Sequence, residues 1–104
     1  AKQLMTLNVA FHSRVARSSR NQILAGILED LAKQVQWHFS AVAPERGEGS
    51  WKEHEGIYAA IEAGDADLAG RLAIQHGQRT QEAFFMQFLS GTPHSAARGE
   101  ATRA

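Results

Sequence analysis

The chain has 104 residues, which is enough for one small domain, and its acidic and basic residues balance to a formal net charge of zero. It has no cysteine, which excludes disulfides and thiolate metal sites, and no run of Lys or Arg, which argues against a free-standing nucleic-acid binder. We find neither an apolar run long enough for a membrane span nor a signal peptide, so we expect a cytoplasmic protein. The first residue is Ala rather than Met, which is typical of a piece of a longer chain.

The first half of the chain shows two stretches of helical hydrophobic periodicity. The first predicts a helix over residues 3–17, and the second predicts a helix over 22–42, with a tight turn between them that is rich in capping residues. Residues 43–49 contain Pro44 and two glycines and are predicted to form a polar loop.

The second half predicts two helices joined by a sharp turn. Ser50 and Glu53 have the spacing of a capping box and open a helix over residues 50–63. Gly64 suits the end of that helix, and Asp65 suits the N-cap of the next one, over 66–89. The fold class is therefore all-α, an antiparallel helical bundle over residues 1–89, and residues 90–104 are expected to be a flexible tail.

Three histidines and one asparagine fall on the apolar stripes of these helices. Asn8 and His12 are one helical turn apart and share a face. His54 and His76 lie at nearly equal distances from the Gly64 turn, so their rings should be level in an antiparallel hairpin. His38 also lies on a stripe, but it is about 20 Å further along the bundle and should not join them.

This constellation predicts a divalent metal site, because imidazole nitrogens and one oxygen form a common first shell for zinc, nickel and similar ions. The predicted ligands are Asn8, His12, His54 and His76, and zinc or nickel is the expected ion. Two alternatives stay open at this point. The histidines could be core residues of a structural or dimerisation bundle, or the metal could activate water in a hydrolase.

Several of the same residues resemble a known family, the all-helical FCD domain of GntR-type bacterial transcription regulators. The resemblance runs from Leu4 to Phe88 and rests on the following segments: Asn8-Val9-Ala10-Phe11-His12, Ser19-Arg20-Asn21, Glu53-His54-Glu55-Gly56-Ile57-Tyr58-Ala59-Ala60-Ile61-Glu62-Ala63-Gly64-Asp65, Ala69 and His76. It implies a sensor rather than an enzyme, with no catalytic residues. The same four residues would hold the metal, and a small organic acid would bind beside it as effector.

The resemblance also implies a homodimer that binds DNA through a winged-helix domain absent from this chain. The first helices of the FCD domain would be missing as well. The family more often has Asp where this chain has Asn8, which should weaken metal binding and favour an anionic effector. No arginine can be assigned to an effector carboxylate, so the effector-binding residues are left open.

Overall fold

The computed structural model describes residues 2–90, apart from the side chains of Lys2, Trp37 and His38. This part of the chain forms three helices, α1 (Lys2–Ser18), α2 (Gln22–Glu62) and α3 (Ala66–Ser90), and contains no strand. The all-α class is thus confirmed. The expected tail, beyond Ser90 at the end of α3, lies outside the described residues.

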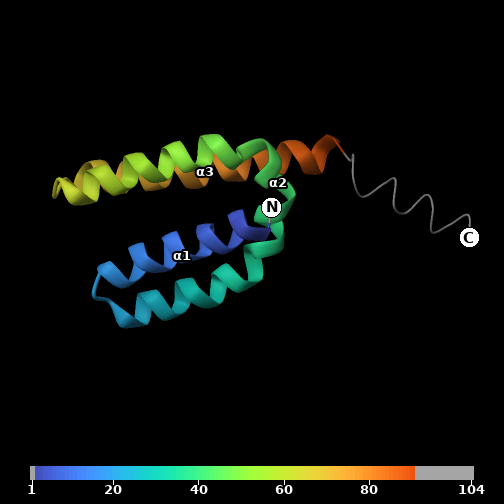
Figure 1. Cartoon of the computed structure of the whole chain (residues 1–104). Coiled ribbons are helices and arrows are strands. Elements are labelled where there is room, and N and C mark those ends of the chain that lie inside the picture. The colour runs from blue at the N-terminus through green and yellow to red at the C-terminus, as the bar shows by residue number, and fades with distance from the viewer. Residues whose placement is uncertain (1, 91–104) are drawn as a thin grey trace, which may run out of the picture.

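The helices make two antiparallel hairpins that share α2 (Figure 1). The first hairpin pairs α1 with the N-terminal part of α2, and the second pairs the C-terminal part of α2, including Glu45 and Arg46, with α3. Between these parts α2 bends and crosses from one hairpin to the other (Figure 1). The backbones of α1 and α3 do not approach within 8 Å anywhere in residues 2–90, so α2 connects the two hairpins.

The predicted loop at residues 43–49 is wrong, because α2 continues through Pro44 as one helix of 41 residues. Proline removes one helical hydrogen bond and crowds the preceding turn, which bends a helix without necessarily ending it. Packing outweighs the local signals here. Val42 and Ala43 are buried, and a side chain at Gly47 would touch Leu4 of α1 at 3.4 Å.

The two turns follow their sequence signals. Asn21 accepts a hydrogen bond from the backbone N–H of Leu24 and caps α2 at its start. Asp65 accepts from the N–H of Leu68 in the same way and caps α3. Gly64 has a φ of 73°, a left-handed conformation that glycine adopts at little cost. Gly64 and Asp65 thus fix the register of the second hairpin, and Asn21 caps α2 at the turn of the first.

The predicted capping box at Ser50 is wrong for the same reason as the loop. Ser50 lies inside α2 and is buried at 2 % exposure, and its hydroxyl has no partner among the described residues. Glu53 points its carboxylate to α3 instead of to the backbone of Ser50. With no helix start at this point, there are no free backbone N–H groups for a cap to satisfy.

The buried apolar core is small and consists of Ala16, Ala25, Val42, Ala43, Ile57 and Ala60. By contrast, the stripe expected to be buried on the 22–42 helix remains 42–53 % exposed at Leu24, Ile27, Leu28, Leu31 and Val35. Within residues 2–90, no helix is both long and apolar enough to cross a membrane.

Candidate metal centre

Each helix contributes one histidine to a cluster at the junction of the two hairpins. His12 comes from α1, His54 from α2 and His76 from α3. The Nε2 atom of His76 lies 3.2 Å from Nε2 of His54 and 3.4 Å from Nε2 of His12. Both His54 and His76 are buried. The 3.2 Å contact between their Nε2 atoms shows that the equal spacing around the Gly64 turn places their rings level.

These distances fit the first shell of a metal ion. A tetrahedral ion with metal–nitrogen bonds of about 2.0–2.1 Å requires its nitrogen ligands to be about 3.3–3.4 Å apart. The ligand atoms of His12, His54 and His76 all lie within 4.8 Å of one another. Small adjustments of the rings would therefore bring all three nitrogens to one ion.

Ring protons alone cannot give every nitrogen of this cluster a hydrogen-bond partner. Nδ1 of His76 lies 2.8 Å from the carboxylate of Glu53, which as an anion can only accept, so this nitrogen carries the ring proton. Nε2 of a neutral His76 then has one lone pair, yet it faces the nitrogens of two other rings. Nδ1 of His54 is also buried without a hydrogen-bond partner in the described residues. A shared cation would satisfy three Nε2 atoms at once.

Burial and mutual repulsion favour the neutral form of the His12 and His54 rings. Burial lowers the pKa of His12 to about 4, with a further contribution from the charge of His76. Burial also lowers the pKa of His54 to about 4, followed by repulsion from His12 and His76. Neutral imidazole is the form that binds metals, so these rings are ready to coordinate near neutral pH.

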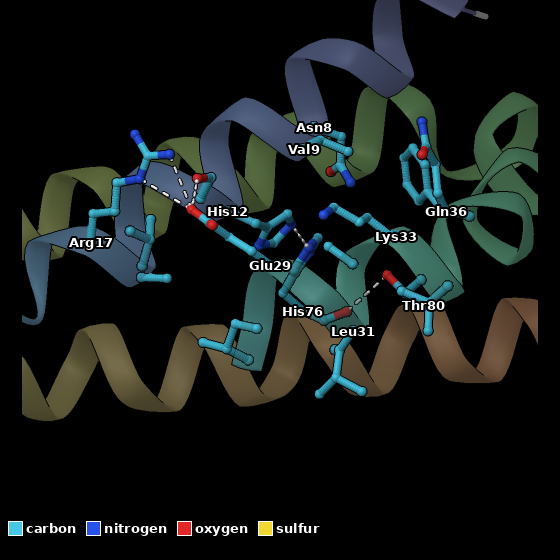
Figure 2. Close-up of a pocket in the computed structure, with 18 residues that line it drawn as sticks. Asn8, Val9, His12, Arg17, Glu29, Leu31, Lys33, Gln36, His76 and Thr80 are labelled. Carbon is cyan, nitrogen blue, oxygen red and sulfur yellow. Dashed lines mark hydrogen bonds and ion pairs between the residues drawn. The ribbon is translucent and has the colours of Figure 1, made fainter. Parts of the chain in front are cut away.

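Asn8 lies one turn before His12 on α1, and the two side chains line the same cavity (Figure 2). Its amide oxygen is buried and has no hydrogen-bond partner in the described structure. A buried carbonyl oxygen without a partner costs roughly 1–3 kcal/mol. This orphaned atom is suited to an added cation, but no ligand role for Asn8 follows from its position alone.

Aromatic contacts hold the His54 ring in place. Phe11 stacks on this ring with 4.1 Å between centroids and an interplanar angle of 10°. Trp51, one turn earlier on α2, meets the ring edge-on at 4.7 Å. Trp51 lies three residues before His54, so this contact follows from helical spacing, whereas the stack of Phe11 on His54 depends on the packing of α1 against α2.

Glu53 is the residue that sequence reasoning missed. The sequence pattern placed it in a capping box with Ser50, but its carboxylate accepts hydrogen bonds from His76, Arg46 and Arg79. Burial alone would raise the pKa of Glu53, but the hydrogen bonds from Arg46, His76 and Arg79 outweigh it and lower the pKa to about 2. Such a carboxylate fixes the orientation and tautomer of a metal-binding histidine.

The only sequence signal for the contact between Glu53 and His76 is the register in which α2 pairs with α3. Glu53 precedes His54, and the antiparallel pairing that levels His54 with His76 also brings position 53 against α3. Glu55, on the other side of His54, is exposed. The side chain of His38 lies outside the described part of the structure, so its expected separation from the cluster stays a prediction.

A cavity of about 650 Å³ opens beside the histidines (Figure 2). It is lined by α1, by the N-terminal part of α2 and by α3. His12, His76 and Asn8 form part of its wall, together with apolar residues of α2. At its edge, Glu29 of α2 accepts hydrogen bonds from Arg17 and Ser13 of α1. The cluster is therefore accessible from a space large enough for a small molecule.

Comparison with protein families identifies this arrangement as a regulatory sensor domain. The FCD domain family matches residues 1–79, most of the chain. The chain therefore belongs to the FCD domain family. FCD domains are the C-terminal effector-binding domains of GntR-type regulators, which are transcription regulators and not enzymes. Comparison with curated proteins and with solved structures returned no match.

Proposed function

We propose that this domain binds a divalent metal ion through Asn8, His12, His54 and His76 and senses a small carboxylate effector beside it. Zinc and nickel are the ions that suit three imidazoles and one oxygen. When bound, the ion supplies a positive charge that attracts an anion. The observation that carries the proposal is the convergence of three Nε2 atoms at 3.2 and 3.4 Å, next to an open cavity.

The protein's own residues prepare this site in two ways. Glu53 holds the proton of His76 on Nδ1 and leaves Nε2 free to coordinate. Phe11 stacks on His54 and restricts its rotation, which reduces the conformational entropy lost on binding. The neutral state of His12 and His54 removes competition from protons near neutral pH.

In the whole regulator, the domain would act in a cytoplasmic homodimer whose winged-helix domains contact an operator. An effector that orders the histidine cluster would favour one arrangement of the dimer over another and so change its affinity for DNA. Apolar side chains at the end of α3, Phe85, Met86, Phe88 and Leu89, are 52–76 % exposed and offer surface for contacts with another copy or domain.

A metal-dependent hydrolase is a less well supported interpretation of the same geometry. It requires a general base beside the metal-bound water, with a pKa near the working pH. Glu53 is the carboxylate that contacts the cluster, but its hydrogen bonds lower its pKa to about 2, far from that range. A metal-free dimerisation bundle is the other alternative, and it leaves the orphaned oxygen of Asn8 without an explanation.

The test is a metal titration of protein purified without a nickel column. Trp51 lies against His54, so its fluorescence should report zinc or nickel binding at the cluster. Substitution His54→Ala should weaken binding at least 100-fold, because it removes a central ligand. Substitution Asn8→Asp should strengthen binding about tenfold, since a carboxylate is a better ligand than an amide oxygen.

Gln75→Ala is the matched control, because this exposed α3 residue is adjacent to His76 and outside the cluster. It should leave metal affinity unchanged. Unaltered affinity in His54→Ala, or no binding by the unmodified chain, would favour the metal-free bundle. Hydrolysis of a model ester that disappears with the metal would favour the enzyme.

A further inference from the structure

The wall of the cavity beside the histidines is polar on one side and mostly apolar elsewhere. One side carries His12, His76 and Asn8, whose polar atoms converge on the candidate metal position. The remaining wall is dominated by side chains without hydrogen-bonding groups: Val9, Val15, Ala16, Leu28, Leu31, Ala32, Val35 and Phe39. A ligand that reaches the histidines must lie along this apolar wall.

Most polar side chains of the wall are already engaged with the protein. Ser13 donates to Glu29 at 3.2 Å, and Arg17 donates to the same oxygen at 3.1 and 3.2 Å. Thr80 donates its hydroxyl hydrogen to the carbonyl of His76 at 3.1 Å. Gln36 and Lys33 are the remaining polar side chains of this wall, so a ligand with many hydroxyls would lose more hydrogen bonds to water than these two groups could replace.

The charges of the lining favour an anion at the cluster. Arg17 and Lys33 are its two cationic side chains, and Glu29 is its one anionic side chain. Arg17 pairs with Glu29, while the ammonium of Lys33 is 3.9 Å from Asp30, a distant contact between two exposed groups. In Figure 2 the Lys33 side chain lies beside the histidines, with its nitrogen end on the side of His12 and Asn8. Its charge adds to that of a metal in attracting a carboxylate.

Building on the proposed metal and carboxylate function, we infer that the effector is an acid with an apolar body, not a polyhydroxylated acid. The carboxylate lies at the histidine cluster, and the hydrocarbon body covers the wall formed by Leu28, Leu31 and Val35. These three residues are 42–51 % exposed, so their apolar surface is available to a ligand. Removing this surface from water supplies the affinity that a hydroxylated body would not gain.

The sharpest test compares hexanoate with gluconate, two six-carbon acids that differ in hydroxyl groups on the same chain. The zinc-loaded domain is titrated with each acid by calorimetry. Hexanoate should bind at least tenfold more tightly than gluconate. In the series butanoate, hexanoate and octanoate, affinity should rise by up to about fourfold for each added methylene that reaches the wall.

A pair of variants ties the preference to the wall. Leu28→Ser should weaken hexanoate binding about fivefold, with little effect on acetate or on zinc, because Leu28 is outside the metal cluster. Ile23→Ser is the matched control on the same helix, since Ile23 is 79 % exposed and does not line the cavity. Circular dichroism and zinc affinity establish that each variant is folded.

The outcomes separate this inference from the function on which it rests. Failure to bind zinc would refute the proposed metal site itself. Zinc binding with gluconate equal to or tighter than hexanoate would overturn the inference and leave the metal site standing. Zinc binding without affinity for any acid would also overturn it, and would mean that the apolar wall is covered by protein rather than by a ligand.

Discussion

The two hairpins of this domain are built from similar amounts of helix but are packed very differently. The second hairpin buries Ile57 and Ala60 of α2 at 3 % exposure. It also holds Glu53 between Arg46 of the same helix and His76 and Arg79 of α3. The first hairpin leaves Ile27 and Leu31 about half exposed, although both lie on the apolar stripe of α2. Helical periodicity marks both stripes equally, so burial depends on what lies opposite each stripe.

The difference explains where the site is. A rigid second hairpin fixes two histidines at matched heights, and the looser first hairpin adds the third and leaves room for a cavity. Binding sites commonly combine a firm scaffold with a more open wall. Three measurements would test this contrast.

The proposed difference in packing between the two hairpins is wrong if their apolar stripes contribute equally to the free energy of unfolding. Ile57→Ala removes a buried side chain and should lower the free energy of unfolding by about 2–4 kcal/mol. Ile27→Ala changes a side chain that is 53 % exposed and should cost less than about 1 kcal/mol. Urea denaturation of both variants, followed by circular dichroism, measures the two costs, and similar values would contradict the proposed division.

The ion-pair network of the second hairpin should matter for metal binding as well as for packing. Glu53→Gln keeps an oxygen that can accept from His76 but removes the charge facing Arg46 and Arg79, and should weaken zinc affinity about 10–100-fold. Glu55→Gln, the same change on the exposed side of His54, is the control. Competition with a chromophoric chelator measures both affinities, and equal values would show that Glu53 has no influence on the metal.

Acidification should weaken the junction of the hairpins in the metal-free protein. The pKa values of His12 and His54 are lowered from 6.5 to about 4 in the folded state, so between these values the unfolded chain binds more protons. Stability is therefore complete above about pH 6.5 and is lost as the pH falls toward 4. Glu53, with a pKa of about 2, stays charged through this window.

Thermal melts in the presence of a chelator should accordingly show a melting temperature that falls by several degrees from about pH 7 to about pH 5. In the double variant His12→Ala and His54→Ala, this fall should largely disappear. A pH profile that is the same in both proteins would mean that other groups dominate acid destabilisation.

Local sequence signals predicted the register of the second hairpin. Contacts between residues far apart in the sequence determine the continuity of α2 at Pro44 and the position of Glu53. Gly64 and Asp65 act within a few residues, so the level placement of His54 and His76 follows from the sequence. Pro44 was misread, because the packing that keeps the helix intact around it comes from α1 and α3. The contact between Glu53 and His76 requires knowing both helix faces at once, which periodicity does not supply.

The bend in α2 has a mechanical consequence. About 22 residues separate Pro44 from the start of this helix, a lever roughly 33 Å long at 1.5 Å per residue. A rotation of about 5° at Pro44 would carry the far end of the first hairpin through about 3 Å. The histidine cluster joins α1 to α3, whose backbones are otherwise apart. Because His54 is ten residues from Pro44, about 15 Å along α2, a shift of a few tenths of an ångström at the rings would be roughly doubled at the far end of the first hairpin.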